Sequence, residues 1–381
     1  MKIAAIICEY NPFHNGHKFH IDETRRQTGA DAVVALMSGN YVQRGECAIY
    51  EKTVRANAAV LGGADLVLEL PTVFAVQSAE FFAKNSVKIL DALGCADTLA
   101  FGAECSDTEE IKKIAEFLSD EPPEYRARLA EVQSLGKSYP AARAECVREF
   151  LGDNAAEILS APNNILAVEY CKALFSIGST IVPHAICRRG AEHDSAQANA
   201  EFASASYIRS LLQSGKTDKA FEYIPPECRE IFISESIHSA ENMSRAIIGE
   251  ILKMPTDELA LISDVSEGLE NRIKEKTAAV QSLAELADAV KTKRYTHSRV
   301  RRILLHAYLG IKPVDRTASP PYIKVLAHNT RGCEVIRLAK KTAKLPIVRN
   351  TSQINKLRDK NAKLFWERER VFDRLYALFR Q

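Results

Sequence analysis

The sequence predicts an α/β protein in which a parallel sheet with its covering helices comes first and a mainly helical, basic region follows. Short apolar runs alternate with helical patterns over the first hundred residues, which is the rhythm of βαβ units. These runs are apolar throughout rather than alternating, as expected for strands that are covered on both faces. Residues 291–381 carry 23 Lys and Arg against 6 Asp and Glu, so positive charge is concentrated at one end.

The first part of the chain contains the strands and helices in regular order. The predicted strands are residues 3–8, 32–37, 66–70 and 98–102, and the apolar run 181–187 is a candidate for another. The predicted helices between them are residues 16–28, 51–61 and 78–93. Because βαβ crossovers are right-handed, these units build an open, Rossmann-like parallel sheet. Ligands of such sheets bind at the carboxyl ends of the strands.

The second part of the chain is predicted to be mainly helical. Residues 105–176 already look largely helical, and beyond about residue 215 the strand rhythm stops. We therefore predict a catalytic domain over residues 1–215 and a helical, basic region over 216–381. Further predicted helices are residues 204–213, 282–290 and 297–309, and short strands are candidates at 322–326 and 345–348.

Composition excludes several classes of protein. No apolar run approaches the roughly 18 residues of a membrane span, so we expect no membrane partner. The apolar N-terminus is too short for a signal peptide, and Glu9 follows at once, so we interpret it as a buried strand. The 9 cysteines show no Cys-x-x-Cys pair, which argues against both disulfides and a structural zinc site. A cytoplasmic location is the corresponding expectation, and the oligomeric state stays open.

The uneven charge distribution predicts a polyanionic partner. Residues 1–290 carry a net charge of −15 and residues 291–381 a net charge of +17. Nucleic acid is favoured over a membrane surface because Tyr295 and Trp366 lie among the charges and suit base stacking. The alternative is a solvated basic helical surface. The densest basic cluster consists of Lys291, Lys293, Arg294, Arg299, Arg301 and Arg302.

The strongest motif is the segment Glu9–His17, which follows the first strand and opens the first helix. A helix N-terminus offers free N–H groups and a positive dipole end that suit a phosphate group. Gly16 lets the phosphate approach the backbone, and His14 and His17 can face the same side and stabilise charge on a transferring phosphorus. A metal site built with His20 is a rival, but three-residue steps spread these rings over about 120° of helix. We assign no metal ligands to the protein.

A second motif lies at residues 204–209, which read Ser-Ala-Ser-Tyr-Ile-Arg. Its serine-rich helix start and the arginine one turn later can bind the outer phosphates of a triphosphate through hydroxyl, N–H and guanidinium groups. Alone this motif is weak, because many capped helices look similar. Together with the first motif it predicts an ATP-using nucleotidyl transfer enzyme.

The two motifs together resemble those of the His-x-Gly-His nucleotidyltransferases. Five segments are similar, more narrowly, to the bacterial tRNA(Met) cytidine acetate ligase family. They are residues 9–17, 38–46, 76–80, 101–104 and 162–166. The resemblance covers most of residues 1–215 and, more loosely, the basic C-terminal part. Departures include Ser206 and Tyr207 in the second motif, Cys47 after the Gly-Glu pair, and a shortened segment from Arg188 onwards.

The resemblance implies an activity and a set of residues. It implies that ATP, with Mg²⁺, and acetate form acetyl-adenylate, and that the acetyl group passes to N4 of the wobble cytidine of elongator tRNA(Met). His14 and His17 are then expected to stabilise the α-phosphate transition state, and Ser204 and Arg209 to hold the outer phosphates. The implied ATP-binding residues are Ile7, Cys8, Glu9, Tyr10, Asn11, Pro12, Phe13, His14, Asn15, Gly16, His17, Lys18, Phe19, His20, Gly102, Asn163 and Arg188.

Some choices stay open within this reading. Asn164 and Arg189 are alternatives to Asn163 and Arg188 at their positions. Two other functions also remain. A small-molecule adenylyltransferase would use the basic region for oligomerisation, and a non-catalytic ATP-sensing RNA-binding protein would bind tRNA without releasing pyrophosphate.

Overall fold

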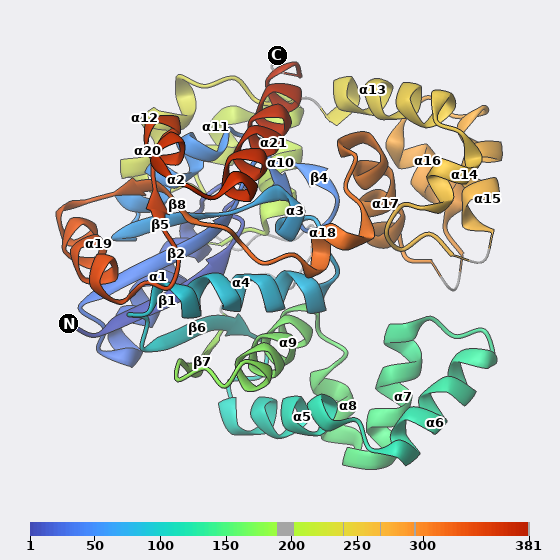
Figure 1. Cartoon of the computed structure of the whole chain (residues 1–381), viewed down its shortest axis with the longest axis horizontal. Coiled ribbons are helices and arrows are strands. Elements are labelled where there is room, and N and C mark those ends of the chain that lie inside the picture. The colour runs from blue at the N-terminus through green and yellow to red at the C-terminus, as the bar shows by residue number, and fades with distance from the viewer. Residues whose placement is uncertain (189–201, 239, 267, 293–294, 380–381) are drawn as a thin grey trace.

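The protein is organised around one seven-stranded sheet, which the computed structural model shows in Figure 1. The structure describes residues 1–188, 202–238, 240–266, 268–292 and 295–379. In spatial order the strands are β7 (Val182–Cys187), β6 (Thr98–Ala103), β1 (Ile3–Cys8), β2 (Ala32–Ser38), β5 (Leu66–Leu70), β8 (Ile323–His328) and β9 (Ile347–Val348). Strand β8 runs antiparallel to β5, and the other neighbours are parallel. The α/β fold class is thereby confirmed.

Both faces of the sheet are buried, as the unbroken apolar runs predict. Successive side chains of a strand point to opposite faces. In β1, Ile3 and Ala5 therefore pack into one hydrophobic core and Ile6 into a second. The helices of the layer around Ile6 are α1 (Asn15–Thr28), α2 (Lys52–Leu61), α10 (Ala205–Gln213), α11 (Thr217–Phe221) and α12 (Pro226–Ile233). The opposite layer contains α4 (Ala79–Leu93), α5 (Thr108–Asp120), α9 (Pro162–Ser176) and α19 (Thr330–Thr342).

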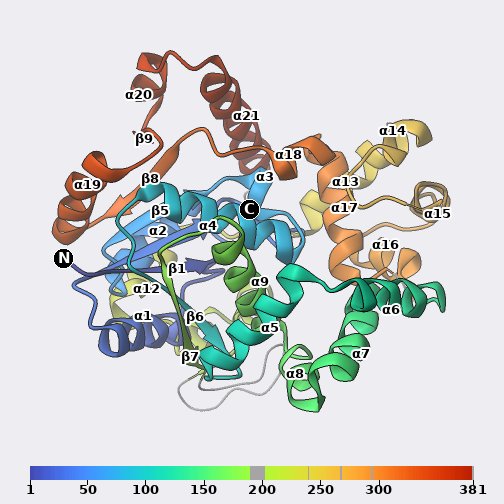
Figure 2. The same cartoon turned by 60° about the horizontal axis from the view of Figure 1, so that its bottom comes forward.

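Two groups of helices extend beyond the sheet on the side of its carboxyl edge (Figure 1). The first group is α6 (Pro123–Ser134), α7 (Tyr139–Leu151) and α8 (Asp153–Ile158). The second is a bundle of α13 (Ala240–Lys253), α14 (Thr256–Ala260), α15 (Leu269–Thr277), α16 (Leu283–Val290), α17 (His297–Leu309) and α18 (Pro313–Thr317). Figure 2 shows both groups on the same side of the molecule, and residues of α6 and α17 together line a small pocket, so the two groups face each other. None of the described helices has the length and apolar character that crossing a membrane requires.

The C-terminal part of the chain returns to the sheet. Beyond residue 216 the chain is mainly helical, as expected, and the short strands expected near residues 322–326 and 345–348 are present as β8 and β9. They extend the sheet beyond β5, so the sheet takes strands from both sides of the division that we place near residue 215. The remaining elements are α3 (Thr72–Ala75), α20 (Thr351–Lys356), α21 (Lys360–Ala377) and the small hairpin of β3 (Tyr41–Val42) and β4 (Glu46–Cys47).

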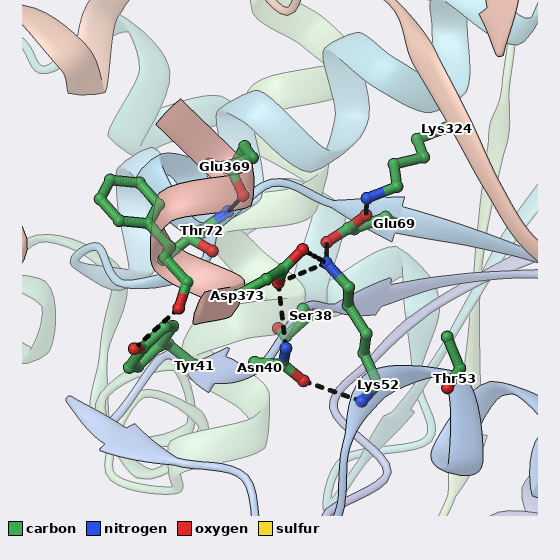
Figure 3. Close-up of polar contacts among 12 residues, drawn as sticks. Ser38, Asn40, Tyr41, Lys52, Thr53, Glu69, Thr72, Lys324, Glu369 and Asp373 are labelled. Carbon is green, nitrogen blue, oxygen red and sulfur yellow. Dashed lines mark hydrogen bonds and ion pairs between the residues drawn. The ribbon is translucent and has the colours of Figure 1, made fainter. Parts of the chain in front are cut away.

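Helix α21 is joined to the N-terminal half by a buried polar network (Figure 3). The Lys52 ammonium contacts Glu69 at 2.7 Å and Asp373 of α21 at 2.6 Å. Asn40 donates to Asp373 at 3.0 Å and accepts from the Lys52 backbone N–H at 2.8 Å. Burial works to lower the pKa of Lys52, but the two carboxylates raise it above its ordinary value. Because Asn40 immediately precedes β3, this network fixes the base of the β3–β4 hairpin.

Candidate active site

A cavity of about 1270 Å³ opens at the carboxyl edge of the sheet. Its lining comes from segments that are far apart in the sequence. They are the end of β1 with the start of α1, the β3–β4 hairpin, the end of β6, α7, α9, the start of α10, and the start of α17. The two helical groups therefore contribute to the same space as the His-x-Gly-His loop. The location agrees with the general rule for parallel sheets.

The two motif histidines lie together at the start of α1. His14 is the N-cap, and its Nδ1 accepts the Gly16 N–H at 3.0 Å. The rings of His14 and His17 lie with their centroids 3.8 Å apart, so both face one side, as predicted. The Tyr10 ring packs against the His17 ring with the centroids 4.8 Å apart, and Tyr10 adopts a left-handed backbone with φ 47°. Such a conformation is rare for a bulky residue and is characteristic of functional sites.

These imidazoles are held neutral. Burial, aided by the charges of Arg188 and Arg209, lowers the pKa of His14 to about 3. Burial and then His14 itself lower the pKa of His17 well below its ordinary value. Burial and Arg188 lower the pKa of His20 to about 4. A neutral imidazole has one N–H. Since the Nδ1 of His14 is an acceptor, its Nε2 carries the hydrogen and can donate to a phosphate oxygen without a charge on the ring.

The lowered pKa of His14 gives the first prediction. Below pH 6.5 the unfolded chain protonates His14 while the folded chain does not, so stability is lost as the pH falls from 6.5 towards 3. At pH 5 the loss attributable to His14 is about 2 kcal/mol. Urea unfolding at pH 7.5 and pH 5 should show that His14→Gln is relatively more stable at pH 5 by this amount. Parallel pH profiles for the two proteins would contradict the assignment.

The second motif forms the adjacent side of the cavity. Ser204 is the N-cap of α10, with its Oγ accepting from the Tyr207 N–H at 3.1 Å, and it lines the cavity. Arg209 donates to the Asn11 carbonyl at 2.9 Å, so this arginine is fixed against the loop that precedes His14. The structure thus brings together the two motifs that lie almost 200 residues apart in the sequence.

The other expected nucleotide contacts meet near the ends of β6 and β7. A Cβ added to Gly102 would lie 3.4 Å from Arg188 Cγ, so this glycine leaves room for the arginine side chain. Asn163 lines the cavity and donates to Glu104 at 2.6 Å. Asn164 is buried and accepts from the Glu104 backbone N–H at 2.9 Å. Their contacts favour Asn163 as the ligand-facing residue; Arg189 lies outside the described residues.

Some residues of the expected ATP-binding segment do not line the cavity. Phe13 is fully buried in the core beside α2, and Lys18 forms an ion pair with Glu227 at 3.1 Å. Asn15 donates its backbone N–H to the Tyr223 carbonyl at 2.9 Å. Pro12 is the fourth residue of the segment that does not belong to the cavity lining. The segment expected from 7 to 20 therefore divides into residues that face the cavity and residues that fix the loop.

Several site residues have no individual role in the sequence-based interpretation. Arg55 is fully buried and donates to the backbone carbonyls of Glu9, Tyr50 and Gly39, so it joins the ends of β1 and β2. Glu46 of the hairpin pairs with Arg301 of α17 and lies 3.9 Å from Arg209. The sequence signal for Arg55 was weak: it is an arginine between Val54 and Ala56 in a helix that also carries other polar residues.

Part of the predicted basic cluster lines the same cavity. Lys291, Arg299, Arg301 and Arg302 belong to its lining, and we call them the basic wall. Lys293 and Arg294 lie outside the described residues. The basic wall faces a cavity that is also lined by the two sequence motifs, which the charge distribution alone could not show.

Comparisons with known proteins agree with this geometry. A family model described as HIGH Nucleotidyl Transferase matches residues 1–381. A tRNA(Met) cytidine acetate ligase from a Thermoanaerobacter species is 42% identical, with 99% of this chain and 95% of that protein covered. The protein of that name from Clostridium novyi is 36% identical, with 91% and 89% covered.

Solved structures give the same result. Apo TmcAL from Thermotoga maritima is 34% identical and matches with a TM-score of 0.94 over 100% of this chain and 95% of that one. The same protein bound to alpha-thio ATP is 35% identical and matches with a TM-score of 0.88 over 97% and 91%. The chain belongs to the HIGH nucleotidyl transferases and, among them, to the tRNA(Met) cytidine acetate ligase family.

Proposed function

We propose that this protein is a ligase that uses ATP to activate acetate and transfers the acetyl group to N4 of the wobble cytidine of elongator tRNA(Met). The observation that carries the proposal is the cavity that joins the two phosphate-binding motifs to the basic wall. A small-molecule adenylyltransferase has no need of a basic wall beside its nucleotide site. The names of the relatives supply the tRNA and the acetate.

In the first step an acetate oxygen attacks the α-phosphorus of ATP. The bond from that phosphorus to the bridging oxygen breaks, and acetyl-adenylate and pyrophosphate form. Such a transfer depends on positioning and charge stabilisation rather than on a protein nucleophile. His14 and His17 donate N–H groups to the α-phosphate, and Ser204 and Arg209 hold the outer phosphates. Gly102, Asn163 and Arg188 line the part of the cavity assigned to the adenosine.

In the second step the cytidine amine attacks the acetyl carbonyl of the adenylate. A C–N bond forms, the C–O bond to AMP breaks, and the amine loses a proton. The basic wall binds RNA phosphates, so the affinity for tRNA falls as salt rises. Arg301 of the basic wall is already paired with Glu46 of the β3–β4 hairpin, and Glu46 also lies 3.9 Å from Arg209 of the second motif. The hairpin therefore connects the side of the cavity proposed for RNA to the side proposed for ATP.

Magnesium is the expected companion of the triphosphate. Within the described part of the chain, no group of three His, Cys, Asp or Glu side chains is arranged to hold a metal ion. Mg²⁺ prefers phosphate oxygens and water over an all-protein cage, which is compatible with such a site. When bound to the triphosphate, Mg²⁺ neutralises charge on the pyrophosphate leaving group.

ATP–pyrophosphate exchange tests the first step. The purified protein should exchange labelled pyrophosphate into ATP when acetate is present and without any RNA. Exchange that needs a phosphorylated small molecule instead of acetate would show that the protein is a small-molecule adenylyltransferase. Binding of tRNA without any exchange would make it a non-catalytic ATP-sensing protein.

Gly16→Ala provides a second prediction, which concerns the geometry of the loop. A Cβ at Gly16 would lie 2.9 Å from His14 Cε1, so the imidazole must shift. A shift of this kind is expected to slow exchange by about 10²-fold, because misplacement near 1 Å has that cost. Stability should not fall, since alanine favours a helix. Gly249→Ala in α13 is the matched control: no atom of the described residues lies within 4 Å of its added Cβ. Normal exchange by the Gly16 variant would contradict the placement.

A further inference from the structure

Arg302 is an unusual member of the basic wall because its side chain is buried. It lies in α17, is 9% exposed, and still lines the catalytic cavity. The helix is pressed against the β3–β4 hairpin: a Cβ added to Gly45 would lie 2.6 Å from the Arg302 backbone nitrogen. The position of this arginine is therefore fixed by backbone packing.

The buried guanidinium has no partner within the described part of the chain. Its Nε is a buried atom without a hydrogen-bond partner, and no hydrogen bond or ion pair joins the Arg302 guanidinium to a described residue. The two neighbouring arginines of the basic wall, in contrast, each have a partner. Arg301 pairs with Glu46, and Arg299 donates to the Asp264 carbonyl at 2.7 Å. The Asp264 carboxylate lies 3.6 Å from Arg316.

An unpaired buried cation is costly, and proteins usually retain such a group for a ligand. Burial lowers the pKa of Arg302, and the Asp264 carboxylate opposes this from a greater distance than an ion pair. The first turn of α17, which Thr296 caps, also lines the cavity and adds the positive end of the helix dipole. The missing partner is therefore an anion that fits a planar guanidinium, and a phosphate group meets that description.

Resting on the proposed function, we infer that Arg302 binds a backbone phosphate of the RNA beside the nucleotide whose base enters the cavity. ATP is the other source of phosphate in the cavity. The ATP motifs lie on α1 and α10 and have their own arginine, Arg209. Arg302 instead shares α17 with Arg299, and Lys291 lies just before that helix. An RNA backbone can therefore run along this side of the cavity, where these basic side chains lie.

The test compares the wild type with Arg302→Gln in two assays. With a tRNA(Met) transcript, KM for RNA should rise by about 10- to 100-fold, the effect of one hydrogen bond to a charged group. The slope of log affinity against log salt should become shallower by about 0.7 to 0.9, corresponding to one phosphate. Acetate-dependent ATP–pyrophosphate exchange, which uses no RNA, should keep its rate and its KM for ATP.

Thermal unfolding without RNA distinguishes a ligand-binding arginine from a structural one. Because Arg302 is buried without a partner, Arg302→Gln should leave the melting temperature equal or higher. Arg302→Lys should recover part of the RNA affinity, and Arg337→Gln on exposed α19 is the matched control, expected to keep both KM values. A higher KM for ATP, an unchanged KM and salt slope for RNA, or a lower melting temperature would each overturn the inference. Absence of exchange in the wild type would instead refute the proposed function.

Discussion

Replacement of His14 by alanine is expected to lower acetate-dependent ATP–pyrophosphate exchange by about 10²- to 10³-fold, the typical cost of removing one preorganised donor to a developing negative charge. The His14 ring lies against the His17 ring and accepts the Gly16 N–H, so the substitution removes the proposed phosphate donor and also loosens its neighbour. The measurement is the exchange rate at saturating ATP and acetate, so that weaker binding does not obscure a slower step.

The matched control is His184→Ala. His184 lies on β7 and contacts Gln27 at 3.1 Å, and it is not part of the cavity lining. Its variant should exchange at the wild-type rate. If the two variants retained equal activity, the imidazole at position 14 would have no role in the transfer.

Lys52→Met is expected to destabilise the protein by about 3 to 5 kcal/mol, because removing one member of a buried ion pair leaves charge uncompensated. Glu69 is 2% exposed and would keep Lys324, but Asp373 would lose its cation (Figure 3). The charged form of the nearby Glu369 is already disfavoured, because burial and the charge of Glu69 raise the pKa of its carboxyl to about 7. Urea unfolding followed by circular dichroism measures the difference.

Lys344→Met is the comparison for this prediction. Lys344 pairs with Asp91 at 2.7 Å, but its side chain is 66% exposed. Exposed pairs contribute about 0 to 1 kcal/mol, so this variant should unfold almost as the wild type does. Equal losses in the two variants would mean that the buried network does not hold α21 on the sheet.

The sequence predicted the local elements of the catalytic half well because their signals are local. The strand at residues 3–8 and the helix that follows have clear local patterns, and the His-x-Gly-His motif between them predicts where phosphate binds. The short strands near 322–326 and 345–348 were also identified. Their partners could not be, because pairing of β8 with β5 joins residues more than 250 positions apart and no local pattern encodes it.

The same limit applies to the candidate site. Charge counting identified the region that contains Arg302, but the burial of its side chain, without a partner among the described residues, depends on how α17 meets the β3–β4 hairpin. Likewise, the sequence indicated helices within residues 105–176 without indicating that Arg143 of α7 reaches the cavity. Such contacts are set by tertiary packing, and the Arg55 contacts with backbone carbonyls belong to the same class.

The most direct test of the central claim is a stoichiometry measurement. The protein would be incubated with labelled acetate, ATP and a tRNA(Met) transcript, and acetylated RNA, AMP and pyrophosphate would be counted together. We expect one acetyl group in RNA for each AMP and each pyrophosphate released, with no product when the wobble cytidine is replaced by uridine. Formation of ADP and phosphate, or release of AMP without acetyl groups in RNA, would contradict the account.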